Sequence, residues 1–401
     1  MYNNIDLGPV AQTLPTALLE TKFALRVLRR LSSVDSSQNI FFSPLGLLMT
    51  LSILYNGAHG HTRDSLSKVL HDSTITIDKY NERNRENIVN LNGQTGCEFS
   101  IATALWLMYG VNFRDEFVNV CVEKYMASLF QADFRNPQSV RCINEWVANA
   151  TKGRINSILQ SLSEDTRMVV TNAVYFKGKW KKQFPFKLTK NEHFHLPDGR
   201  TKEIAMMQTE GEFWHRTGDG FQAVRLDYLN SSTSMFVYLP DSSVDLFSFV
   251  NWLDAEAFKM VNFTKREGVV RIPRFEVDFE ARLNTVLQKL ELEDLFKPGR
   301  ANFARLCTRP DYIYVSEFRH KANLRVDEEG TVAAAATAAA ASWGKAPSAK
   351  EKFRFTADRP FIVAIKDNTM EQILFLGVIT NPGILSALES GAEAEQEQPL
   401  A

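Results

Sequence analysis

The sequence has few cysteines, almost no net charge and no long apolar segment. Only four of its 401 residues are cysteine, and none is spaced as Cys-x-x-Cys, so we read them as free thiols rather than as a disulfide framework or a zinc site. The formal net charge is −1, which gives no reason to expect nucleic acid or an anionic membrane as a partner. No stretch of about 18 apolar residues occurs, so no transmembrane span is predicted.

Motifs of catalysis and metal binding are also missing. The sequence contains neither His-Glu-x-x-His nor Gly-x-Ser-x-Gly, the signatures of zinc proteases and of many serine hydrolases. Two His-x-His pairs occur, at His59 and His61 and at His193 and His195, but neither belongs to a fuller metal-binding motif. We therefore expect no metal, no cofactor and no enzymatic activity.

The first residues do not form an ordinary signal peptide. Residues 1–13 contain no basic head followed by an apolar block. Asn149, Asn230 and Asn262 stand in Asn-x-Ser/Thr triplets, which would be glycosylated in a secreted chain. We expect an extracellular or cell-surface location without a recognisable signal peptide, and a cytoplasmic location is the alternative.

What the chain does have is the composition of a globular protein, with 44% hydrophobic and 23% charged residues. Helical periodicity dominates the first 165 residues and strand-like segments dominate afterwards, which indicates an α+β fold rather than alternating βαβ units. The predicted helices are 15–32, 44–55 and 281–296. The predicted strands are 103–109, 169–176, 234–239, 312–317, 361–365 and 373–379.

The most unusual segment is a run of small side chains that extends from Gly330 to Ala341 and follows two glutamates. Taken alone it is typical of a helix, because alanine has the highest helix propensity, or of a low-complexity linker. The segment also has a property that neither interpretation uses: its small side chains could enter a densely packed region of a protein without a steric clash. Residues 383–401 contain four glutamates and no basic residue, and we predict that this acidic tail is disordered.

Several short motifs follow one another along the chain. They are Asn39-Ile40-Phe41-Phe42-Ser43-Pro44 with Asn56-Gly57-Ala58, Ile143-Asn144-x-Trp146-Val147, Asn172-Ala173-Val174-Tyr175-Phe176-Lys177-Gly178-x-Trp180, Pro273-Arg274-Phe275, Val315-Ser316-Glu317 with His320-Lys321-Ala322, and Phe375-Leu376-Gly377-Val378-Ile379 with Pro382. In this order they resemble the motifs of the serpins, over roughly residues 15–382. One departure is mild: a basic residue is common in the family where Val378 stands.

The resemblance implies a serpin fold of the α+β class. It would be a single domain over residues 1–382, with three β-sheets, about eight or nine helices and an exposed reactive-centre loop at about 328–354. It also implies a metastable serine protease inhibitor that acts as a suicide substrate. The protease forms an acyl-enzyme with the loop and is trapped when the cut loop inserts into the main sheet.

The resemblance also assigns residues to roles in loop insertion. Ser43, Asn172 and His320 match the shutter cluster, which holds the central strands together, and Trp180 and Lys321 match the breach, where insertion starts. The matching hinge residues are Glu328, Glu329, Gly330, Thr331, Ala333, Ala335 and Thr337. The inserting side chains are only Thr and Ala, which favours an inhibitor over the alternative, a non-inhibitory serpin that acts as a carrier, chaperone or storage protein.

The position of the cut remains open between neighbouring bonds. The family's usual spacing places it between Gly344 and Lys345. A cut after Lys345 would suit trypsin-like proteases, whose pocket carries a carboxylate, and we favour it on that chemistry. A cut after Trp343 would suit chymotrypsin-like enzymes, and Lys350 is a more distant option.

The expected partner is therefore a serine protease, most simply a trypsin-like one, and the expected state is a monomer. A basic run is the remaining candidate surface. It could bind a glycosaminoglycan, although a solvated strand end is the preferred interpretation. The run consists of Lys177, Lys179, Lys181, Lys182 and Lys187.

Overall fold

The computed structural model describes residues 9–34, 37–70, 76–92, 95–229, 232–330 and 351–383, with the backbone alone for 9–16. Most of the expected reactive-centre loop and nearly all of the acidic tail lie outside these ranges. The predicted residues that lie outside them are Asn230, Thr331, Ala333, Ala335, Thr337, Trp343, Gly344, Lys345 and Lys350.

Most helices come from the first part of the chain, as predicted. Ser43 caps α2, because its Oγ accepts a hydrogen bond from the Gly46 amide and Pro44 takes the first helical position. Nearly every side chain of α2 is buried, which explains its continuous apolar sequence. The α-helices of the described residues are α1 (Pro9–Ser32), α2 (Pro44–Gly57), α3 (Gly60–Leu70), α4 (Ile77–Asn92), α5 (Asp115–Tyr125), α6 (Gln138–Ala150), α7 (Leu246–Trp252) and α8 (Asn284–Leu287).

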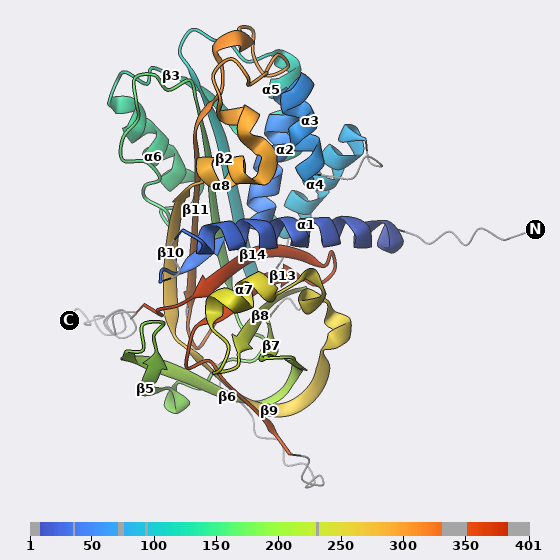
Figure 1. Cartoon of the computed structure of the whole chain (residues 1–401), viewed down its shortest axis with the longest axis vertical. Coiled ribbons are helices and arrows are strands. Elements are labelled where there is room, and N and C mark those ends of the chain that lie inside the picture. The colour runs from blue at the N-terminus through green and yellow to red at the C-terminus, as the bar shows by residue number, and fades with distance from the viewer. Residues whose placement is uncertain are drawn as a thin grey trace, which may run out of the picture.

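A five-stranded sheet forms the centre of the molecule, in the order β10-β11-β4-β2-β3. The neighbouring strands β11 and β4 are parallel. Figure 1 shows α6 on one side of this sheet and the cluster of α2 to α5 on the other. The strands are β10 (Phe275–Arg282), β11 (Val315–Val326), β4 (Met168–Gly178), β2 (Cys97–Met108) and β3 (Ser128–Ala132).

The second sheet has nine strands in the order β1-β14-β13-β8-β7-β6-β9-β12, and β5 also pairs with β6. The 18-residue β6 pairs with β5 and β9 and then, at its end, with β7. Two of the three expected sheets are therefore continuous through β6. The strands are β1 (Ile40–Phe42), β5 (Lys190–His195), β6 (Thr201–Gly218), β7 (Phe221–Asp227), β8 (Thr233–Pro240), β9 (Thr264–Pro273), β12 (Phe353–Thr356), β13 (Phe361–Asp367) and β14 (Gln372–Ile379).

Two predicted elements differ from the structure. The helix predicted at 281–296 is broken, because β10 continues to Arg282 and a kink with a left-handed Glu291 (φ 71°) separates α8 from a final 3-10 turn at Glu293–Phe296. The strand predicted at 312–317 begins three residues later, at Val315, and continues to Val326. Pro310 starts a 3-10 turn there, since its ring fixes φ near the helical value.

The central sheet is buried on both faces by alternation of side chains. Ala102, Ala104 and Trp106 of β2 pack under α6, whereas Leu105 and Leu107 point into the larger core. The sheet therefore lies between two apolar layers, and any change in its strand order must disturb both.

Candidate functional site

The two central strands pair over only part of their length. The parallel register of β11 and β4 runs from Val315 opposite Met168 to Asn323 opposite Tyr175. Beyond Asn323, β11 stays paired with β10 as far as Val326, and β4 stays paired with β2 as far as Gly178. The sheet is therefore closed at one end of the β11–β4 seam and open at the other.

A tight turn at Asp327–Gly330 fills the open end. The Asp327 amide donates to the Gly330 carbonyl at 2.8 Å. The Asp327 carboxylate Oδ1 accepts from the amides of Glu329 and Gly330 at 3.1 and 3.2 Å. Burial raises the pKa of Asp327, although these amides oppose that shift. The first three hinge residues are thus held in a defined conformation.

The turn is fastened to the segment that follows β4. The Trp180 amide donates to the Glu329 carbonyl, and the Phe184 amide donates to the Glu328 carbonyl, both at 2.9 Å. Gly330 forms an antiparallel bridge with Lys179. Its φ is 145°, and a Cβ there would lie 2.2 Å from the carbonyl oxygen of Gly178, so only glycine fits.

Glu328 is the most deeply buried acid of the hinge, with its side chain 1% exposed. The Arg274 guanidinium donates two hydrogen bonds to its carboxylate, one from Nε to Oε2 at 3.0 Å and one from Nη2 to Oε1. The Thr189 hydroxyl donates to Oε1 at 2.7 Å. The prediction assigned no role to Arg274 or Thr189. The Pro273-Arg274-Phe275 motif was the available signal, but spacing cannot connect it to an acid 54 residues away.

Of the two residues predicted for the breach, Trp180 lies at the open end of the seam, whereas Lys321 lies farther along β11. The Trp180 indole donates to the Asp327 carbonyl at 2.9 Å and stacks on Tyr228 at 4.6 Å between ring centroids. Lys321 lies opposite Ala173 in mid-strand and pairs with Asp278 and Glu280 of β10 at 3.3 and 3.4 Å. Six residues of extended strand, about 20 Å, separate Lys321 from Asp327.

The structure brings the three predicted shutter residues together. The His320 ring on β11 hydrogen bonds to the Asn172 Oδ1 on β4 at 2.8 Å, directly across the parallel seam. The Ser43 amide at the start of α2 donates to His320 Nε2 at 3.2 Å. Two further members were not predicted: Thr103 accepts from Asn172 at 3.0 Å, and the Leu374 carbonyl accepts from the Ser43 hydroxyl at 2.7 Å.

These contacts determine the protonation state of His320. Since Nε2 accepts from an amide, the proton must be on Nδ1, which donates to Asn172. Complete burial lowers the pKa of His320 to about 3. The shutter is therefore a neutral hydrogen-bonded cluster, and a second proton on the ring would break its contact with Ser43.

Helix α6 covers one face of the central sheet. Ile143 and Val147 are fully buried against small residues of the strands, among them Ala173. Asn144 fastens the segment after the helix, because its Oδ1 accepts from the amides of Ile158 and Leu159 at 2.8 and 3.1 Å. The apolar contact with the sheet thus combines aliphatic side chains with an aromatic group, in which Trp146 of α6 contacts the rings of Trp106 and Phe130.

The remaining predicted groups lie away from the open end of the seam or at its surface. The four cysteines are free thiols, which confirms that prediction. Among the described residues, no group of three potential metal ligands occurs, and no helix is long and apolar enough to cross a membrane. Lys179, Lys181 and Lys187 are exposed around the turn that holds the hinge, and a glycosaminoglycan at this site stays a prediction.

Comparisons with known proteins agree with this geometry. A family model described as Serpin (serine protease inhibitor) matches residues 19–382. The human leukocyte elastase inhibitor is 31% identical over 378 residues, which cover 90% of this chain and 98% of that protein. The thermophilic serpin tengpin in its native state has a TM-score of 0.84 at 24% identity and covers 95% of this chain and 96% of its own. Human thyroxine-binding globulin also has a TM-score of 0.84 at 24% identity, with coverages of 92% and 99%. This chain belongs to the serpin family.

Proposed function

We propose that the chain inhibits a serine protease as a suicide substrate and traps it as an acyl-enzyme when the cut loop enters the five-stranded sheet. One observation carries the proposal: a parallel strand pair is open at the end where a glycine turn reverses the chain. A strand continuing from Gly330 between β11 and β4 would run antiparallel to both. It would replace one parallel ladder with two antiparallel ones, which are slightly more stable per residue.

The register of the turn sets the length of such a strand. Asp327 faces Gly330 in the turn, so an unbroken register would place Thr331 beside Val326 and Ser342 beside Val315. The strand that pairs with the 12 residues of β11 would then be residues 331–342, that is, the alanine-rich run after Gly330 together with Ser342. The candidate bonds after Trp343, Gly344 and Lys345 would all lie just past the far end of β11, about 40 Å from the hinge.

The composition of that run supports inhibition over a non-inhibitory role. Alternate residues of a strand share a face, so Thr331, Ala333, Ala335 and Thr337 would face the same layer. Both layers beside the sheet are already packed with buried side chains. Small side chains enter such a layer with the least overpacking. Similarity alone does not separate the two functions, since this chain is similar both to the human leukocyte elastase inhibitor and to human thyroxine-binding globulin.

The experiment mixes the purified protein with trypsin, chymotrypsin and elastase and follows complexes that survive SDS. Mass spectrometry of the C-terminal fragment, released by denaturation, locates the cut. We expect a covalent complex with trypsin and a fragment that begins at Ala346, as proposed for recognition of Lys345 by a trypsin-like target. A fragment that begins at Gly344 or Lys345 would move the cut to the preceding bonds.

Clean cleavage without a complex, and without a gain in thermal stability, would instead support the carrier, chaperone or storage role. Inhibition uses no catalytic residue of this chain, because the protease supplies the chemistry. A monomeric state, an extracellular location and a polyanion that binds the lysine run remain predictions. The sequons at Asn149 and Asn262 are exposed, so glycan mass at either site would support export.

A further inference from the structure

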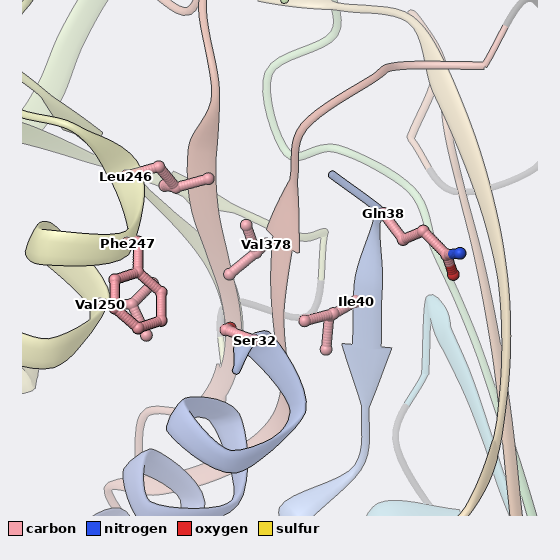
Figure 2. A pocket seen from close by; sticks show the side chains of 7 residues that line it. All are labelled: Ser32, Gln38, Ile40, Leu246, Phe247, Val250 and Val378. Atoms are coloured by element: carbon pink, nitrogen blue, oxygen red, sulfur yellow. The ribbon is translucent and has the colours of Figure 1, made fainter. Parts of the chain in front are cut away.

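A small apolar pocket lies outside the insertion site, between the end of α1, the paired strands β1 and β14, and α7. Figure 2 shows the side chains of Ile40, Leu246, Val250 and Val378 gathered around Ser32, whereas Gln38 points away from them. The cavity volume is about 20 Å³, enough for the tip of one aliphatic side chain rather than for a cofactor.

Both the interior and the rim of this pocket are incompletely covered. Ser32 is 6% exposed, and its hydroxyl has no hydrogen-bond partner within the described part of the chain. Phe247, on the rim, is 45% exposed, and Val34, just beyond α1, is 75% exposed. A buried hydroxyl and neighbouring exposed apolar side chains are features of a surface that another segment covers.

The acidic tail follows β14, whose residue Val378 lines this pocket. Asn39 lies between two lining residues, and its Oδ1 accepts from the amides of Thr380 and Asn381 at 2.8 and 2.9 Å. Lys202 donates to the Pro382 carbonyl at 3.0 Å and fixes the chain just before Gly383. By contrast, Pro9 lies at the other end of the 24-residue α1, which is about 36 Å long. Figure 1 shows the N-terminal end of α1 on the far side from α7.

The sequence after Gly383 has apolar residues that suit the apolar pocket, followed by acidic residues that suit the arginines beside it. Ile384, Leu385 and Leu388 form an apolar cluster, and the glutamates follow it, beginning with Glu389. Extended, the five residues 384–388 span about 17 Å. The five steps from Val378, which lines the pocket, to Gly383 have at most the same extended length, so a reversed segment can reach back to the pocket. Arg29 and Arg30 in the last turn of α1 lie beside it.

These two arginines provide the complementary charge. The Arg29 guanidinium donates to the carbonyls of Val250 and Leu253 at 3.3 and 2.6 Å, which places it over α7. Arg30 is exposed, and it forms no ion pair with the described residues. Both cations can therefore attract the acidic part of the tail once its apolar part is in place.

We propose that residues 384–388 fold back onto this pocket, with one of their aliphatic side chains against Phe247 and Val250 and the following glutamates near Arg30. The occupant is thus a segment of this same chain. The segment would join α1, α7 and the β1–β14 pair from outside the sheet. Only the part beyond Leu388 then remains a predicted disordered tail. This inference is independent of the proposed function, because protease trapping uses none of these residues.

Hydrogen–deuterium exchange on the full chain tests the docking. We compare the wild type with the double variant Leu385→Asp/Leu388→Asp and with Leu400→Asp, a matched control at the far end of the tail. In the wild type and the control we expect residues 384–388 to exchange at least about tenfold more slowly than in the double variant, with slower exchange in α7 as well. These substitutions leave every described residue intact.

A second pair of variants changes the pocket itself. Phe247→Ala should remove protection from the tail, whereas Val261→Ala, an 83% exposed apolar residue outside the pocket, should not. Equal exchange of residues 384–388 in the wild type and the double variant would overturn the proposal. Protection that grows with protein concentration, together with a dimer in size-exclusion chromatography, would also overturn it, because the occupant would then be a second copy.

Discussion

Removal of the Arg274 guanidinium should destabilise the hinge more than any other loss of an ion pair described here. In Arg274→Ala the carboxylate of Glu328, with its side chain 1% exposed, would keep only the Thr189 hydroxyl as a side-chain donor. Breaking one side of a buried ion pair costs about 3–5 kcal/mol, because the remaining charge is left in a poorly solvated place. For a chain of this size that corresponds to a decrease of about 4–6 °C in the unfolding temperature.

Differential scanning calorimetry at a fixed scan rate measures this shift. Arg282→Ala is the matched control, since it removes an arginine from an ion pair with Glu317 in which the arginine is 53% exposed, and exposed pairs contribute about 0–1 kcal/mol. The double variant Arg274→Ala/Glu328→Ala should recover part of the loss, because it also removes the unpaired charge. Equal unfolding temperatures for Arg274→Ala and Arg282→Ala would refute the reasoning.

Three further predictions follow from the same site. Ala335→Arg should turn an inhibitor into a substrate, because a charge on the inserting face adds to the insertion barrier and each 1.4 kcal/mol slows insertion about tenfold; a stable protease complex on denaturing gels would contradict this. Gly330→Ala should lower the unfolding temperature, since its Cβ would lie 2.2 Å from the Gly178 carbonyl oxygen. The control is Gly110→Ala, because Gly110 also has a positive φ but has open space around it. Equal decreases in the unfolding temperature of the two variants would show that backbone strain alone matters. Burial lowers the pKa of His320 to about 3, so the contribution of neutral His320 to the free energy of unfolding is complete above pH 6.5. It should fall by about 1.4 kcal/mol per pH unit from there toward pH 3. The free energy of unfolding, measured at pH 7.5, 6.5 and 5.5, should therefore decrease more steeply in the wild type than in His320→Gln, and parallel decreases in the two proteins would exclude this role.

Much of the site could be predicted because the motifs resemble those of a family whose members share one fold. Ser43, Asn172 and His320 are far apart in the sequence, yet all three were assigned to one cluster and the structure brings them together. Lys321 and Trp180 lie apart because the residues of a strand are spaced along its length. Lys321 follows His320 directly, in the middle of the seam, and therefore cannot also reach the open end.

Other features depend on contacts that a linear pattern does not contain. The Arg274–Glu328 pair connects the residue between β9 and β10 to the turn that follows β11, and local spacing does not distinguish Arg274 from the other basic residues. The kink at Glu291 interrupts a segment whose apolar spacing remains helical. At the kink, tertiary packing overrides the local helix propensity, which is only a weak determinant of structure.

The pairing of β1 with β14 also has a consequence for synthesis. Ile40 lies opposite Val378, so a strand made almost first can pair only with a strand made almost last. At about 5–20 residues per second the ribosome needs roughly 20–70 s to connect them. Until then β8 lacks its neighbour β13 and presents an unpaired edge. The nascent chain therefore depends on protection of that edge, and a truncated chain that lacks residues 361–379 should aggregate rather than form a smaller fold.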